Sequence, residues 1–205
     1  PLGQQFYTVS SGTSHAAPAV AGACALLRQY FLNQNLTAPS PAMTKAYLMN
    51  STRFLTGAGA NDNLWSPGQG MGALNIGRAF DGVPRILRDQ EAPDLLTASG
   101  QTRVFTGRIV ETNQPLRVTL AWTDAPGSTT GNAFNNDLDL TVEVGGTVYF
   151  GNRFSGAYSV SGGSTDGKNN VESVLLPAGL SGDITVTVTA ANINSDGVPN
   201  FGPSM

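Results

Sequence analysis

The stretch Ser11–Gly22, with the sequence SGTSHAAPAVAG, decides how the first part of the chain folds. From Val20 within it onward, apolar side chains recur at three- and four-residue spacing, which predicts a helix from about Ser14 to about Phe31. The recurring residues are Val20, Cys24, Leu27 and Phe31. Alanines between them keep the helix thin on all sides, which suits close burial against neighbours. Pro18 is expected in the first turn, where a proline is tolerated.

Ser14 therefore lies at the foot of a predicted helix. The first N–H groups of a helix have no internal partners and the helix dipole is positive there, so an oxyanion forming beside Ser14 would meet a donor and a favourable field. Gly12 allows a tight turn before the helix and leaves room for a substrate. These residues alone permit two interpretations, a hydroxyl nucleophile or an N-cap serine on an alanine-rich core helix.

The stretch resembles the serine signature of the subtilisin-like proteases, Gly-Thr-Ser-x-Ala-x-Pro-x-x-Ala-Gly. Every fixed position of this signature is matched, by Gly12, Thr13, Ser14, Ala16, Pro18, Ala21 and Gly22. The resemblance implies that Ser14 is the catalytic nucleophile. It also implies that residues 1–82 are the C-terminal part of an α/β peptidase domain. We expect this region to have no autonomous core, since the main strands of that fold would lie upstream.

The chain contains a single histidine, His15, which follows Ser14 directly. Neighbouring positions on a helix point roughly 100° apart, so His15 is not expected to act as the base for Ser14. In the family the catalytic Asp and His and the oxyanion Asn all precede the serine. The resemblance therefore implies that an upstream segment or a second chain supplies these three groups, and that this chain alone is inactive.

The composition narrows the class of protein. The net charge is −3, 12% of the residues are charged and 40% are apolar, with no basic run, which argues against a nucleic-acid partner. No apolar run is long enough to cross a bilayer. The single Cys24 excludes an intrachain disulfide and is expected to be a small buried hydrophobe. Few charges and many small polar residues favour a secreted, extracellular protein.

Further elements of the first region follow from local signals, and the pattern changes near residues 82–84. The expected elements are a strand at Gln5–Ser10, a helix from Pro41 after an N-cap at Ser40 to about Ser51, and a short helix at Ile76–Phe80. Beyond them, polar and apolar residues alternate, which predicts strands at Thr102–Ile109, Leu116–Trp122, Leu138–Val144, Thr147–Phe150, Val171–Leu176 and Asp183–Ala190. This spacing predicts an all-β domain over residues 83–205, an antiparallel sandwich or jelly roll, with Trp122 in its core.

Three segments of the second region carry a further resemblance. Leu116–Gly127 (LRVTLAWTDAPG), Asn136–Leu140 (NDLDL) and Asp166–Glu172 (DGKNNVE) are similar to the C-terminal β-barrel of the oxidatively stable alkaline subtilisins, a module related to the kexin-type P domain. The family continues into a last apolar strand, whereas Asn194–Met205 is polar and rich in turn residues. Either the sandwich lacks its closing strand or another chain supplies it.

Acidic and amide side chains in these segments form an oxygen-rich set. It comprises Asp137, Asp139, Asp166 and Glu172, together with Asn136, Asn169 and Asn170. Calcium takes six to eight oxygen ligands of this kind, and Asp137 and Asp139 share one face of a strand. The same residues could instead be turn residues that satisfy their own backbone. The β-barrel of the family carries calcium, so the resemblance implies a calcium site at Asp137, Asp139, Asp166 and Glu172. The chain has no Cys/His cluster for structural zinc.

Two functional hypotheses of different classes follow. In the first, the chain is the serine-bearing C-terminal portion of a secreted subtilisin-like endopeptidase that cleaves protein or peptide substrates through an acyl-enzyme on Ser14. In the second, it is a non-catalytic fragment whose β-sandwich acts as a stabilising or binding module. An Asp and a His motif encoded upstream would favour the first hypothesis for the parent protein.

Overall fold

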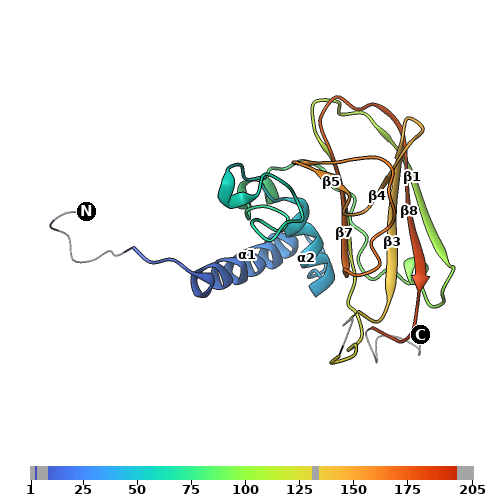
Figure 1. Ribbon diagram of the computed structural model, residues 1–205, viewed down its shortest axis with the longest axis horizontal. Coiled ribbons are helices and arrows are strands. Elements are labelled where there is room, and N and C mark those ends of the chain that lie inside the picture. Colours follow the sequence, from blue (N-terminus) through green and yellow to red (C-terminus); the bar gives the residue numbers. More distant parts are fainter. Residues whose placement is uncertain (1–2, 4–8, 131–133, 198–205) are drawn as a thin grey trace. The chain divides into compact units, whose positions relative to one another are not determined.

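The computed structural model describes residue 3 and residues 9–130 and 134–197. The chain falls into two compact units, Pro1–Pro39 and Ser40–Met205 (Figure 1). Most of the strand expected at Gln5–Ser10 lies outside the described residues, and Val9 and Ser10 are not in a strand. In the described part of the chain, no helix has the length and apolarity needed to cross a membrane.

The first unit contains one helix, α1 (Thr13–Asn33), close to the predicted span. It starts after Gly12, whose φ of 136° is a conformation that residues with a Cβ rarely adopt. It ends at Asn33 and is followed by a left-handed Asn35, after which the Leu36 N–H donates to the Phe31 carbonyl at 2.9 Å, as in a C-terminal capping motif of helices. The placement of Pro18 in the first turn was wrong, because α1 begins at Thr13 and Pro18 lies beyond that turn. Its missing N–H leaves the Ser14 carbonyl without the usual helical donor.

The second unit is built mainly from antiparallel strands. Its larger sheet has the order β1 (Thr102–Ile109), β8 (Gly182–Asn192), β3 (Asp137–Val144) and β4 (Thr147–Phe150). A second sheet pairs β2 (Leu116–Ala121) with β7 (Val171–Leu176), and β5 (Phe154–Ser155) forms a short hairpin with β6 (Tyr158–Ser159). Every predicted strand after residue 83 is present within two residues of its predicted ends. The sequence missed β5 and β6, which are too short to show a period.

One hydrophobic core joins the two sheets. Alternate side chains of β3 are buried in it, and Val174 and Leu176 of β7 belong to the same core. Trp122 packs against this core, as predicted. The antiparallel β architecture of the second region is therefore observed, while the jelly-roll connection stays a prediction. After β8, the described residues 193–197 form no further strand.

Residues 40–82 cover the outer face of the β2–β7 pair. The helix α2 (Pro41–Asn50) lies against β2, and Leu175 of β7 packs with Leu64 and Met71. Short helical turns complete this layer and the link to β1, namely η1 (Ala58–Ala60), α3 (Ile76–Ala79) and η2 (Ala92–Asp94). These residues thus share a compact unit with the strands. The predicted division into 1–82 and 83–205 concerns family modules and stays a prediction.

The helix α2 begins as its sequence predicts. The Ser40 hydroxyl accepts a hydrogen bond from the Met43 N–H at 3.0 Å, and Pro41 occupies the first position of the helix. The Ser40 N–H donates to Asp89 Oδ2 at 2.8 Å, so both polar groups of the N-cap have partners.

Replacement of Leu140 by Ala tests the shared core. Leu140 is 1% exposed, so we expect Leu140→Ala to lower the free energy of unfolding by about 2–5 kcal/mol, through lost burial and the cavity left behind. Val104→Ala on β1, where Val104 is 57% exposed, is the control and should cost less than about 1 kcal/mol. Urea denaturation monitored by circular dichroism measures both, and equal losses would contradict the assigned core.

Candidate catalytic serine and acidic cluster

Ser14 is the second residue of α1. The N–H groups of His15 and Ala16 donate to the Gly12 carbonyl at 3.1 and 3.2 Å, which closes the first turn around the serine. Ser14 is exposed, and so is every residue from 11 to 22. The arrangement leaves the hydroxyl accessible at the positive end of a helix dipole.

The single histidine of the chain does not face this hydroxyl. His15 Nε2 lies 2.7 Å from the Ser10 hydroxyl, in an exposed hydrogen bond. This contact agrees with the expectation that His15 flanks the serine and does not serve as its base. The chain therefore brings no imidazole to Ser14, and the role of Ser14 as a nucleophile stays a prediction.

The acidic residues lie on two different sheets and one loop. Asp137 and Asp139 begin β3 and alternate with the buried Leu138 and Leu140, so both carboxylates lie on the face opposite those leucines. Glu172 projects from β7 and is completely buried. Its Oε2 accepts a hydrogen bond from the Leu140 N–H at 2.7 Å, so this side chain bridges the two sheets.

The space around Glu172 admits no larger neighbour at Gly151. A Cβ at that position would overlap the Glu172 carboxylate, so a glycine is needed there for steric reasons.

Asp166 belongs to the loop before β7 and is held by several donors. Its Oδ2 accepts from Asn152 Nδ2 at 2.7 Å and from Asn169 Nδ2 at 2.6 Å, and its Oδ1 accepts from the Lys168 N–H at 3.1 Å. Asn152 also donates to the Val171 carbonyl at 2.8 Å, which ties the loop to β7. Sequence reasoning missed Asn152; the only signal was its place in a Gly-Asn turn after β4.

The amide members of the predicted oxygen-rich set are occupied with structural contacts. Asn136 Oδ1 accepts from the N–H groups of Asn194 and Ser195 at 2.9 and 3.2 Å. Asn170 Oδ1 accepts from Lys45 Nζ at 2.8 Å. For these two amides the geometry agrees with the alternative that they satisfy local structure.

Three carboxylate oxygens, in contrast, are buried without a hydrogen-bond partner in the described part of the chain. They are Asp137 Oδ1, Asp139 Oδ1 and Glu172 Oε1. A buried anionic oxygen without a donor or cation is unfavourable. These carboxylate oxygens thus differ from the Asn136 and Asn170 amide oxygens, which accept hydrogen bonds.

The pKa values reflect this environment. Burial raises the pKa of Glu172 to about 8; the Leu140 N–H opposes the rise, while Asp139, Asp166 and Asp137 add to it. Burial also raises the pKa of Asp137, and Asp139 and Asp166 contribute to the same rise. For Asp139, burial raises the pKa, a hydrogen bond from Thr165 lowers it, and Asp166 raises it further. The carboxyl groups therefore act on one another electrostatically.

The donor chemistry fits calcium, which takes carboxylate oxygens. In the orientations that the described residues adopt, however, no three His, Cys, Asp or Glu side chains stand close enough to hold one metal ion. The calcium site thus rests on uncompensated charge and donor type, and not on coordination distances.

Comparison with known proteins finds a family that the first part of the chain resembles. Residues 1–72 match the model of the Subtilase family, Peptidase_S8. The matched range contains Ser14, α1 and α2. No curated protein matches the chain. Residues 1–72 are thus similar to a serine peptidase family that acts on protein substrates, and the similarity to a P-like domain after them stays a prediction.

The buried Glu172 predicts a pH dependence in the absence of divalent cations. Between its ordinary pKa of 4.5 and its folded value of about 8, the folded state binds more protons than the unfolded state. The free energy of unfolding should therefore fall as the pH rises through that window. Glu172→Gln should reduce this slope, as measured by urea unfolding in a chelating buffer. Glu143→Gln, an exposed position on β3, is the matched control, and an unchanged slope in Glu172→Gln would contradict the assignment.

Proposed function

We propose that this chain is the serine-bearing C-terminal portion of a secreted, extracellular subtilisin-like endopeptidase. The observation that carries the proposal is the exposed Ser14 in the first turn of α1, directly after the left-handed Gly12 and within the range that matches the Subtilase family. A protein or peptide is the corresponding substrate.

In this proposal the Ser14 hydroxyl attacks the scissile carbonyl. A histidine takes the hydroxyl proton and later protonates the leaving amine, and an aspartate orients that histidine. The Ser14 N–H, at the positive end of the α1 dipole, donates to the developing oxyanion together with an asparagine side chain. The acyl-enzyme on Ser14 is then hydrolysed by water.

The His, the Asp and the oxyanion Asn come from an upstream segment or a second chain. His15, the one histidine here, is hydrogen-bonded to Ser10, so this chain alone is inactive. The exposure of residues 11–22 and of the apolar Val20, which is 46% exposed, supports a missing partner surface. Apolar side chains on a thin helix are stabilised when a neighbour covers them.

We further propose that calcium compensates the acidic cluster, with Asp137, Asp139, Asp166 and Glu172 as the candidate ligands. Support comes from the three buried carboxylate oxygens that have no partner among the described residues, and from the raised pKa values of Glu172 and both strand aspartates. A divalent cation would favour the ionised carboxylates that burial disfavours. Its role would be to stabilise the β domain, and it would take no part in the reaction at Ser14.

Replacement of Ser14 tests the catalytic assignment. In a full-length protein that carries the upstream Asp and His, Ser14→Ala should reduce kcat for a peptide substrate by on the order of 10⁶-fold without loss of folding. Ser10→Ala is the matched control, since it removes a nearby hydroxyl that contacts His15 and not the reaction. Near-native turnover by Ser14→Ala would refute the nucleophile and favour a non-catalytic module.

Calcium titration tests the acidic cluster. A ligand that binds only the folded state stabilises it by about 2.7 kcal/mol at a free concentration of 100 times its Kd, so the Tm should rise with calcium and fall with a chelator. Asp139→Asn should reduce the shift, while Asp183→Asn, whose side chain is 85% exposed, should preserve it. Identical melting curves in calcium and chelator would exclude the site and leave the residues as turn formers.

A further inference from the structure

Three arginines from distant parts of the sequence line one pocket. Arg53 follows α2, Arg78 lies in α3 and Arg117 lies in β2. The pocket has a volume of about 190 Å³. It lies on the outer face of the β2–β7 pair, because Arg117 is paired in register with Leu175, which packs outward against Leu64 and Met71.

Two of the guanidinium groups are fixed side by side by the same backbone oxygen. Arg78 Nη1 donates to the Thr52 carbonyl at 2.6 Å, and Arg117 Nη1 donates to it at 3.1 Å. Arg117 Nη1 also donates to the Asn50 carbonyl at 2.7 Å. These contacts hold two positive charges together at the C-terminal end of α2, whose carbonyl groups partly compensate them, and an anion would reduce their mutual repulsion further.

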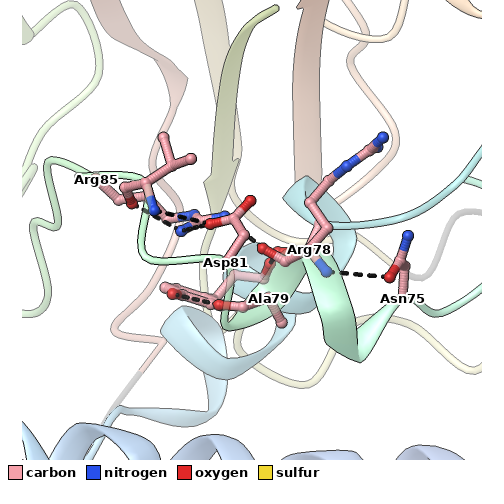
Figure 2. Close-up of polar contacts among 8 residues, drawn as sticks. Asn75, Arg78, Ala79, Asp81 and Arg85 are labelled. Carbon is pink, nitrogen blue, oxygen red and sulfur yellow. Dashed lines mark hydrogen bonds and ion pairs between the residues drawn. The ribbon is translucent and has the colours of Figure 1, made fainter. Parts of the chain in front are cut away.

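No carboxylate neutralises this group within the described residues. Neither Arg53, Arg78 nor Arg117 belongs to an ion pair there, and no Asp or Glu lines the pocket. The acid that acts on Arg78 is Asp81, but Asp81 is paired with Arg85 at 3.0 Å. Figure 2 shows the Arg78 side chain extending away from that pair.

Arg117 also has an unsatisfied donor. Its Nε is buried without a hydrogen-bond partner in the described part of the chain. Burial, and then the neighbouring Arg78, lower the pKa of Arg117 to about 10, so the group remains protonated at neutral pH. A buried donor of this kind is costly until an acceptor reaches it.

The rest of the pocket combines apolar residues with two residues that carry a hydroxyl. Phe54, Leu64, Met71 and Leu175 contribute to the apolar part, and the other two are Thr52 and Tyr158, of which Tyr158 is 44% exposed. A carboxylate matches a guanidinium fork in geometry and charge, and a short apolar substituent matches the remaining lining.

We propose that this pocket binds the carboxylate of a small organic acid, with its oxygens against Arg78 and Arg117 and its apolar part against Phe54 and Leu175. Arg53 at the exposed side adds a third positive charge that attracts the anion. The inference is independent of the serine chemistry, since all of its residues belong to the second compact unit.

The test is calorimetric titration of the 205-residue protein with sodium propionate at constant ionic strength, with chloride as the reference anion. Binding should be saturable and at least tenfold weaker in Arg53→Gln and in Arg78→Gln. Arg108→Gln, which removes an arginine exposed on β1, is the matched control and should leave the affinity unchanged. Because Arg53 is exposed, that variant should keep the native circular dichroism spectrum.

A parallel titration with sulfate tests whether the pocket selects a carboxylate or binds any oxyanion. Propionate binding that exceeds sulfate binding and is lost in the pocket variants supports the proposal. Sulfate that binds as tightly as propionate overturns the carboxylate assignment, because the apolar lining would then contribute nothing. Propionate that binds no better than chloride, or equally well in Arg53→Gln and Arg78→Gln, overturns the site.

Discussion

The second unit depends on the burial of β7 from both sides. All six residues of this strand are buried, although it belongs to a sheet of only two strands. Val174 and Leu176 face the core shared with β3, while Leu175 faces the layer formed by residues 40–82. A two-stranded sheet is marginal by itself, so these two apolar contacts are what keep the pair in place.

The two faces of the β2–β7 pair carry ionisable groups of opposite type, a carboxyl group on one face and an arginine on the other. On the inner side Glu172 accepts a hydrogen bond from the Leu140 N–H of β3, and burial raises the pKa of Glu172, with Asp139, Asp166 and Asp137 adding to the rise. On the outer side Arg117 lies beside Arg78, and both donate to the Thr52 carbonyl. None of the acidic cluster is among the groups that act on the pKa of Arg117. Each cluster therefore needs its own counter-charge, which is the physical basis for proposing a cation on one side and an anion on the other.

The sequence predicted the helices and strands whose side chains repeat with a regular period. Alternation of side chains gave the strands with nearly correct ends, most clearly in β3, where every second side chain is buried. The helix start near Ser14 followed from Gly12, but Pro18 was misplaced because even a start at Ser14 puts it at the fifth helical position, past a first turn of 3.6 residues. Near this start Ser14 is exposed and His15 is hydrogen-bonded to Ser10, while the catalytic role of Ser14 stays a prediction.

The sequence pattern did not predict the contacts between residues that are distant in the chain. The run Val171–Leu176 indicates a buried strand, yet its pattern does not say that Glu172 faces inward and Leu175 outward. Arg53, Arg78 and Arg117 have no regular spacing, and only the packing of α2 on β2 brings them together. The sequence also could not predict the contacts of the amides in the oxygen-rich set. Asn136, for example, accepts hydrogen bonds from a segment about 60 residues away. Composition identified the polar groups, but only the fold separates those that are satisfied by the backbone from those that still require a ligand.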